Sequence, residues 1–429
     1  MTVEAPAFQI SRSRAHFTLL LLFLLMGFDF IDRQVIAALL PAIKQDWQLS
    51  DSQLGLLVSA VNLSIAGLAV PIALVVDRWS RSKAIGCMAV IWSLATAACG
   101  LATNFHQLLL ARAFVGAGEA GYGPSGNALL AASYPQRQRA TVLGLFTSGA
   151  LAGTVAGVIL GGYIAQHWGW QHAFGFVAAP GLLLACAAFL LSDYRSQPLL
   201  QRDGPGGEWR AQRWTETLST LLRSPVLLLI FLGLSAQLFY IATLANWLPS
   251  FFNRAHGMSL QQAGLATGMA LLAGALGMAA GGWIVDRWSQ GRTARRLFAA
   301  ALFCVASALL LALAFSLPPG ETQRTLIMTG LFVGGALMGP VTAAQLDCVH
   351  PAMRAAVGGV LVLAQNLFGM ALGPLLAGWL SDQHGLQTTL LMMSLAPALA
   401  ALCLGLAARR CPRAPDGHNG PQEVSACAS

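Results

Sequence analysis

The sequence Val76-Asp77-Arg78-Trp79-Ser80 recurs in the same order as Val285-Asp286-Arg287-Trp288-Ser289. Each copy follows a long apolar run and opens a basic segment. Both copies therefore mark the same end of a helix on the same side of a membrane. Internal repeats of this kind are typical of membrane proteins with two related lobes. The chain is predicted to contain two versions of one unit.

The composition places this repeated unit in a bilayer. Hydrophobic residues make up 56% of the 429 residues and charged residues 10%, and the mean hydropathy is +0.64. About 20 apolar residues cross the hydrocarbon core as a helix. Twelve segments have this character: 17–43, 53–76, 84–103, 107–132, 140–165, 172–192, 225–252, 260–285, 297–317, 325–349, 355–380 and 387–408. We expect an all-α membrane protein with twelve transmembrane helices in two pseudo-symmetric six-helix bundles.

The distribution of basic residues gives the orientation of these helices. With the N-terminus inside, most of the 25 Lys and Arg residues fall in loops and tails of one side, and only Lys44, Arg254 and Arg324 fall on the other. The positive-inside rule then places both termini in the cytoplasm and the protein in the cytoplasmic (inner) membrane. It also explains the net charge of +8 without nucleic acid. The first helix lacks the features of a cleavable signal and is expected to be retained.

The predicted organisation is an N-terminal bundle over 1–192, a polar cytoplasmic linker over 193–223, a C-terminal bundle over 224–410 and a cytoplasmic tail over 411–429. The linker is rich in Gly, Pro and charged residues. A second repeat supports the division, because Phe114 to Pro124 in the fourth span resembles Phe332 to Pro340 in the tenth.

Five ionisable residues lie deep inside predicted helices, all of them in the first half. They are Asp29, Asp32 and Arg33 in the first span, and Arg112 and Glu119 in the fourth. Each such group costs roughly 2.5 to 3.5 kcal/mol at a helix centre on insertion scales. The second half has Leu337 where the first has Glu119, so the fold does not require this charge. A rise of about 1.5 Å per residue puts Asp32 and Arg112 at the same depth.

Three roles are open for this cluster. Burial makes a carboxylate hold its proton, whereas a nearby arginine favours the ionised form. An arginine that pairs with Glu119 in one conformation and leaves it in the other would couple proton binding to movement. The alternatives are a permanently satisfied ion-pair network and a substrate-binding site without proton coupling.

A second candidate site is the repeated cytoplasmic helix end. Asp77, Arg78 and Arg81, together with Asp286 and Arg287, are predicted to form a cytoplasmic gate by pairing across the two halves. The alternative is that these cations only enforce topology.

Other polar residues carry weaker signals. Six side chains of the seventh, tenth and eleventh spans are candidates to line a cavity, or else form helix-to-helix hydrogen bonds: Gln237, Tyr240, Asn246, Gln345, Gln365 and Asn366. The fingerprint Gly116-x-Gly118-x-x-Gly121 lies inside an apolar helix and is interpreted as packing. We predict no cofactor, and the scattered histidines indicate no metal site.

These motifs resemble a known family. Asp77-Arg78-x-x-Arg81 with its repeat resembles the loop signature of the major facilitator superfamily. Phe30-Ile31-Asp32-Arg33, Leu49-Ser50-Asp51 and the run from Arg112 through Gly118-Glu119-Ala120 to Pro124 resemble the Spinster branch. The resemblance implies a twelve-helix fold with alternating access, functional roles for Asp32, Arg33, Arg112 and Glu119, and lysolipid-like substrates.

The resulting prediction is a proton-coupled secondary transporter, not an enzyme, that moves a small organic or amphipathic anion. A sugar-acid or other organic-anion symporter and a multidrug exporter are alternatives within transport. A membrane sensor or an intramembrane enzyme is the alternative outside it. The expected partners are a small-molecule or lipid-like substrate, protons and membrane lipids, with a monomer as the assembly.

Overall fold

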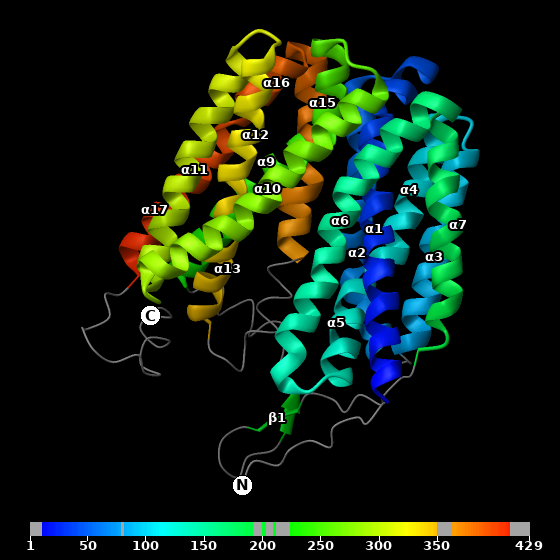
Figure 1. Cartoon of the computed structure of the whole chain (residues 1–429), viewed down its shortest axis with the longest axis vertical. Helices are drawn as coiled ribbons and strands as arrows, with labels where there is room; N and C mark the ends of the chain where they lie inside the picture. The colour runs from blue at the N-terminus through cyan, green and yellow to red at the C-terminus, as the bar shows by residue number, and fades with distance from the viewer. Residues whose placement is uncertain are drawn as a thin grey trace. The chain divides into compact units, whose positions relative to one another are not determined.

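The computed structural model describes residues 11–78, 81–191, 200–202, 209–211, 224–349 and 363–411. Almost all of them are helical, and Figure 1 shows the elements in chain order. The side chains of residues 70, 73–78, 81, 124, 136, 137, 140, 200–202, 209–211 and 346 lie outside this description.

Helices of the first sequence repeat alternate with short connections. They are α1 (Arg12–Trp47), α2 (Asp51–Arg78), α3 (Arg81–Leu101), α4 (Phe105–Glu119), α5 (Tyr122–Ser133), α6 (Gln136–Trp168) and α7 (Trp170–Ala188). Two short strands follow, β1 (Leu200–Arg202) and β2 (Trp209–Ala211). They pair antiparallel with Gln201 opposite Arg210, within the predicted linker.

The described part of the second repeat is also mostly helical. Its elements are α9 (Pro225–His256), α10 (Leu260–Ser289), α11 (Thr293–Ser316), α12 (Glu321–Ala336), α13 (Met338–Asp347), η2 (Asn366–Ala371, a π-helix), α15 (Leu372–His384), α16 (Leu386–Met393) and α17 (Leu395–Arg410). The start of the predicted span 355–380 lies outside the described residues.

The predicted membrane architecture is confirmed. Within the described ranges, eleven helical stretches are long and apolar enough to cross a membrane. The remaining predicted span, 107–132, is present as α4 and α5, which are separated only by Ala120 and Gly121. Most helices extend beyond the predicted apolar segment: α1 has 36 residues, or about 54 Å of helix. The hydropathy pattern identifies only the part of each helix that lies in the hydrocarbon core. The helices therefore extend beyond the predicted spans.

The helices group into two compact units. Unit 1 consists of Met1–Ser196, Ala245–Met269 and Pro374–Asp382, and unit 2 of Gln197–Leu244, Ala270–Gly373 and Gln383–Ser429. Unit 1 therefore contains the first-repeat helices together with segments of α9, α10 and α15. The core of unit 2 includes Leu234 of α9, Cys304 of α11 and Leu404 of α17.

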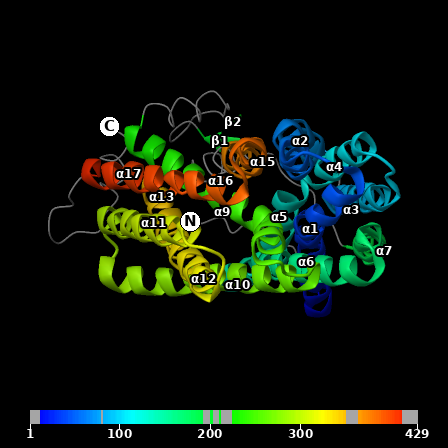
Figure 2. The ribbon, with the colours of Figure 1, turned by 90° about the horizontal axis from the view of Figure 1, so that it is seen from above.

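Glycine allows α6 to lie against α1, and the two helices run side by side in Figure 1 and Figure 2. A Cβ atom added to Gly153 would lie 2.2 Å from the carbonyl oxygen of Gly27, and one added to Gly157 would lie 2.7 Å from that of Ile31. No larger residue fits there without a shift of backbone. This contact fixes which face of α1 meets α6.

Glycine also brings α4 against α2 and α3. A Cβ atom on Gly116 would lie 2.3 Å from the carbonyl oxygen of Val61, and one on Gly118 would lie 2.7 Å from the backbone nitrogen of Trp92. The interpretation of the glycine fingerprint as packing is therefore confirmed. The close approach positions the charged residues of α4 inside unit 1.

Candidate functional site

The five deep charged residues lie together between α1 and α4, within unit 1. Arg33 contacts two carboxylates: its Nε is 2.9 Å from Oε2 of Glu119, and its Nη2 is 3.4 Å from Oδ2 of Asp29. Asp29 and Arg33 are four residues apart on one helix, a spacing that places their side chains next to each other. Arg33 is thus the bridge between α1 and the end of α4.

A second pair lies beside the first. Nη1 of Arg112 is 3.8 Å from Oδ1 of Asp32 and donates a hydrogen bond to the backbone carbonyl of Asp32 at 3.3 Å. The hydroxyl of Thr96, on α3, donates to Oδ2 of Asp32. The expected match in depth between Asp32 and Arg112 is therefore present in the fold, and α3 contributes a third partner.

Exposure separates Arg33 from the rest of the cluster. The Arg33 side chain is 18% exposed, whereas those of Glu119 and Asp32 are fully buried. Its guanidinium also lies 5.0 Å from the centre of the Phe30 ring. Among the five, Arg33 has the most exposed side chain.

Some atoms of the buried side chains in this cluster lack a hydrogen-bond partner among the described residues. Among the described residues, no group donates a hydrogen bond to Oε1 of Glu119 or to Oδ1 of Asp32, and Nε of Arg112 donates none. Three carboxylates face two guanidinium groups, so the fully ionised cluster carries an excess negative charge. An uncompensated buried charge is costly. The cluster is therefore suited to gain or lose a proton.

Glu119 occupies the last position of α4, where the helix is interrupted. Ala120 and Gly121 separate it from Tyr122, the first residue of α5. A Cβ atom on Gly121 would lie 2.7 Å from the Ile72 side chain, so α2 crowds this break. The hydroxyl of Tyr122 donates to the carbonyl oxygen of Leu22 at 2.7 Å, which ties α5 to α1. Glu119 thus lies at the helix break, and its Oε2 contacts Nε of Arg33 there.

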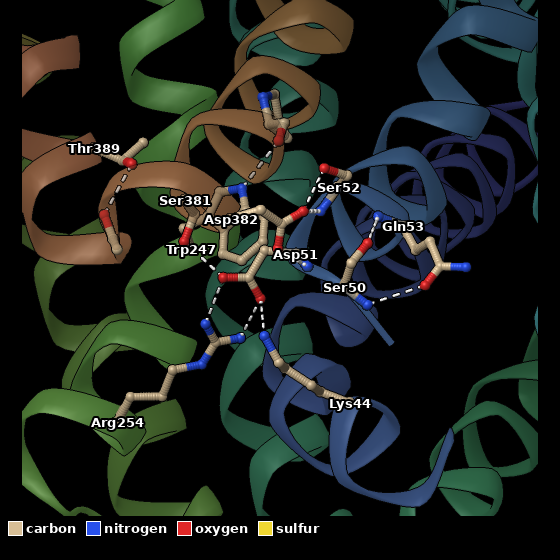
Figure 3. A network of polar contacts seen from close by, with 12 residues as sticks. Lys44, Ser50, Asp51, Ser52, Gln53, Trp247, Arg254, Ser381, Asp382 and Thr389 are labelled. Atoms are coloured by element: carbon tan, nitrogen blue, oxygen red, sulfur yellow. Dashed lines mark hydrogen bonds and ion pairs between the residues drawn. The ribbon is translucent and has the colours of Figure 1, made fainter. Parts of the chain in front are cut away.

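A second network, missed as a site by the sequence analysis, surrounds Asp51 at the start of α2 (Figure 3). We call Lys44, Asp51, Arg254, Ser381 and Asp382 the Asp51 network. Both carboxylate oxygens of Asp51 accept from Arg254, at 2.7 and 2.8 Å. Nζ of Lys44 is 2.5 Å from Oδ1, and the Ser381 hydroxyl donates to Oδ2 at 2.6 Å. Bidentate arginine pairs of this kind are among the stronger charged contacts.

Asp382 completes the network by capping α2. Its Oδ1 accepts from the backbone N–H of Asp51 at 2.7 Å, and its Oδ2 accepts from the backbone N–H of Ser52 at 2.8 Å. A carboxylate at a helix N-terminus satisfies unpaired N–H groups and complements the helix dipole. The network therefore joins α2 of the first repeat to α9 and α15 of the second, all inside unit 1.

The sequence held a signal for this network. Lys44 and Arg254 are two of the three cations predicted on the side opposite the cytoplasm, and Asp51 and Asp382 are predicted at span ends on that same side. Their pairing was not predicted because the three segments are far apart in the chain.

The predicted cytoplasmic gate is described only in part. The side chains of Asp77, Arg78 and Arg81 lie outside the described residues. Asp286 lies 3.3 Å from Nη2 of Arg296, and Nη1 of Arg296 lies 2.8 Å from Asp347. The Arg287 guanidinium lies 3.8 Å from the ring centre of Trp283. These contacts are internal to unit 2, and pairing across the two halves stays a prediction.

The six cavity-lining candidates divide into two groups. Gln237 is buried and donates to the carbonyl oxygen of Gly334 at 3.2 Å, and Tyr240 is buried and donates to that of Leu390 at 3.3 Å. Both side chains thus form the helix-to-helix hydrogen bonds that were the alternative prediction. Asn246 is buried as well. Gln345, Gln365 and Asn366 are partly exposed, and they remain candidates to face a substrate.

Comparison with known proteins agrees with this fold. A family model for the Major Facilitator Superfamily matches residues 22–370. The chain is 27% identical over 396 residues to an MFS-type efflux pump of Mycolicibacterium smegmatis, covering 89% of this chain and 90% of that protein. It is 27% identical over 383 residues to the hexuronate transporter of Bacillus subtilis, covering 86% and 88%. It is 26% identical over 398 residues to protein spinster homolog 1 of Xenopus laevis, covering 87% and 74%.

A solved structure has the same fold. The crystal structure of a bacterial homolog to the human lysosomal transporter Spinster, in an inward-facing and unoccupied conformation, superposes with a TM-score of 0.82 at 24% identity. The match covers 93% of this chain and 98% of the other.

The family match and the membrane-length helices show a multi-pass membrane transporter. The chain belongs to the Major Facilitator Superfamily, and the predicted resemblance to its Spinster-like branch is confirmed. Members of this family are transporters rather than enzymes, so the prediction of a non-enzyme is confirmed as well.

Proposed function

We propose that the protein moves a small organic or amphipathic anion together with protons by alternating access. The observation that carries the proposal is the position of Arg33. It joins Asp29 to Glu119, and it is the one partly exposed member of an otherwise buried cluster. A cation that is reachable by solute and shared by two buried carboxylates is suited to link anion binding to proton binding.

The coupling follows from competition for Arg33. A substrate carboxylate or phosphate that pairs with the Arg33 guanidinium takes it away from Glu119. Glu119 then lies buried without its cation, and uptake of a proton removes the cost of that charge. Substrate and proton therefore bind together, and the release of one favours the release of the other. Arg112 stays with Asp32 and holds α1 against α4 throughout.

The relatives favour an anionic substrate. The hexuronate transporter of Bacillus subtilis, the probable L-galactonate transporter of Escherichia coli and the gallate transporter of Pseudomonas putida are each named for a carboxylate. The Spinster relatives add lysolipid-like anions as a second substrate class by resemblance. The MFS-type efflux pump of Mycolicibacterium smegmatis, which is named for efflux, favours the alternative of an exporter.

Two sets of charges serve as gates in this proposal. The Asp51 network holds α2 to α9 and α15 on the side predicted to be external. Asp77, Arg78 and Arg81, with Asp286 and Arg287, act on the cytoplasmic side. The protein works in the cytoplasmic (inner) membrane as a monomer with both termini in the cytoplasm.

Uptake into proteoliposomes tests the proposal. The panel contains galacturonate, galactonate, gallate and a lysophosphatidylglycerol, each with a neutral analogue, under an imposed proton gradient. We expect at least one anion to accumulate in a gradient-dependent manner, its neutral analogue not to accumulate, and Arg33→Gln to abolish the uptake. Arg324→Gln, at a surface position paired with Glu321, is the matched control. Equal transport of neutral analogues by wild type and Arg33→Gln would contradict the proposal.

A further inference from the structure

An apolar groove lies on unit 2 between α11 and α17. These two helices pack against each other, and Figure 2 shows both. The volume of the groove is about 590 Å³, and its lining includes Trp288, Phe298, Leu302 and Leu406 together with Arg295 and Arg409. The charged cluster described above lies in unit 1 and shares no residue with this groove.

Small residues create the groove. A Cβ atom added to Gly405 of α17 would have Ala301 of α11 as its nearest neighbour, at 4.0 Å. Larger side chains stand exposed along the groove: Phe298 is 51% and Leu302 is 54% exposed. Both belong to a helix long and apolar enough to cross the membrane. Exposed apolar side chains on such a helix face lipid tails, so the groove opens toward hydrocarbon.

One end of the groove is basic, in contrast to its apolar body. Arg295 lies in the first turn of α11 and Arg409 in the last turn of α17, at helix ends predicted to face the cytoplasm. Trp288, half exposed, is nearby at the end of α10. Tryptophan and arginine concentrate where hydrocarbon meets headgroups. The groove thus runs from an apolar body to a basic rim at the membrane surface.

The two arginines of this rim differ from their neighbour Arg296 in their ion pairs. Within the described part of the chain, neither Arg295 nor Arg409 has a carboxylate partner. The neighbouring Arg296, by contrast, contacts both Asp286 and Asp347. The acidic residues Asp286 and Asp347 at this end of unit 2 therefore pair with Arg296.

We propose that the groove binds an anionic phospholipid of the cytoplasmic leaflet. The acyl chain lies along Phe298, Leu302 and Leu406, and the headgroup phosphate pairs with Arg295 and Arg409. Basic pockets between transmembrane helices suit such headgroups, and the volume lies within the usual range of about 300 to 1,000 Å³ for ligand sites. A zwitterionic lipid matches the apolar body but has no net charge to offer the two arginines.

The test is native mass spectrometry of the full-length protein in a neutral detergent, titrated with phosphatidylglycerol or with phosphatidylethanolamine of the same acyl chains. We expect at least one phosphatidylglycerol to be retained about tenfold more tightly than phosphatidylethanolamine. Arg295→Gln/Arg409→Gln should remove this preference. Arg410→Gln, exposed on the same helix end but outside the groove lining, should keep it.

A second variant tests the apolar body. Gly405→Phe fills the groove, and it should lower retention of phosphatidylglycerol while thermal unfolding and elution stay those of the wild type. Inorganic phosphate, added in excess, should compete weakly, because it lacks the acyl chain. The proposal is overturned if the Arg295→Gln/Arg409→Gln variant retains phosphatidylglycerol as the wild type does. It is also overturned if both lipids bind the wild type equally.

Discussion

The two repeats break the same helix at the same place and use the break differently. In the first repeat, α4 ends at Glu119 and α5 begins at Tyr122; in the second, α12 ends at Ala336 and α13 begins at Met338. Glu119 contacts Arg33 at 2.9 Å. Its counterpart Leu337 is fully buried in an apolar core. The interruption belongs to the fold, and the charge is an addition of the first repeat.

Arg112 and its counterpart Gly330 show the same difference between the two repeats. Arg112 fills its space with a guanidinium beside Asp32. A Cβ atom added to Gly330 would lie only 2.5 Å from Cγ of Leu311, so that position holds no side chain at all. At this position the second repeat packs its backbone against the Leu311 side chain, whereas the first repeat forms an ion pair. Deep charges that the second repeat dispenses with are therefore the best candidates for function.

Giving the first repeat the residue of the second produces the largest expected effect. Glu119→Leu should leave the protein folded, because Leu337 fills the equivalent break, and Arg33 keeps Asp29 as a partner. Proton-driven uptake should fall to background. The measurement is uptake in proteoliposomes under a proton gradient, with the far-UV spectrum as the check on folding. Wild-type uptake by Glu119→Leu would make the cluster structural.

Removing Arg33 sharpens the comparison by leaving two carboxylates without their cation. Breaking a buried pair in this way costs about 3 to 5 kcal/mol. Arg33→Gln should therefore unfold at a lower temperature than the wild type, and Arg33→Gln combined with Glu119→Gln should recover part of the loss. Thermal unfolding in detergent, arranged as a double-mutant cycle, measures the recovery. Strict additivity of the two changes would show that the residues do not interact.

The reverse exchange tests the second repeat. Leu337→Glu places a carboxylate in an apolar core with no arginine beside it among the described residues, and the expected cost is about 2.5 to 3.5 kcal/mol. Thermal unfolding should shift downward, whereas the volume-conserving Leu337→Met should stay near wild type. If Leu337→Glu is as stable as Leu337→Met, the second repeat tolerates deep charge and the contrast between the repeats fails.

The smallest effect is expected outside the cluster. Asp51→Asn weakens the contacts to Arg254 and Lys44, with a coupling of about 0.5 to 3 kcal/mol to Arg254→Gln. Turnover should change because the Asp51 network joins three helices. The ratio of protons to substrate should not, because Glu119 and Arg33 are untouched. A changed ratio, measured from lumenal pH and substrate uptake together, would assign the network to coupling.

The sequence predicted most of the fold for a simple physical reason. A membrane span must be long and apolar, and internal repeats such as Val76 to Ser80 locate equivalent helix ends. The cost of burying charge also singled out Asp29, Asp32, Arg33, Arg112 and Glu119, which the structure brings together. Each of these signals can be read directly from the residues of one amino-acid sequence.

Long-range pairing was harder to foresee. Asp51 contacts Arg254 and Ser381 across 203 and 330 residues of sequence, and no local pattern specifies such pairs. Thr96 was missed as a partner of Asp32 because a threonine in an apolar helix is ordinarily satisfied by its own backbone. Gln237 and Tyr240 were predicted either to line a cavity or to form helix-to-helix hydrogen bonds, and both donate to carbonyl oxygens of neighbouring helices.

Glu119 carries the coupled proton in the proposed mechanism. The most direct test compares the wild type with Glu119→Gln in proteoliposomes, recording substrate counterflow without a gradient and lumenal pH during net uptake. We expect the variant to retain counterflow and to lose the substrate-dependent change in pH, whereas the wild type shows both. A substrate-dependent pH change of wild-type size in Glu119→Gln would contradict this mechanism.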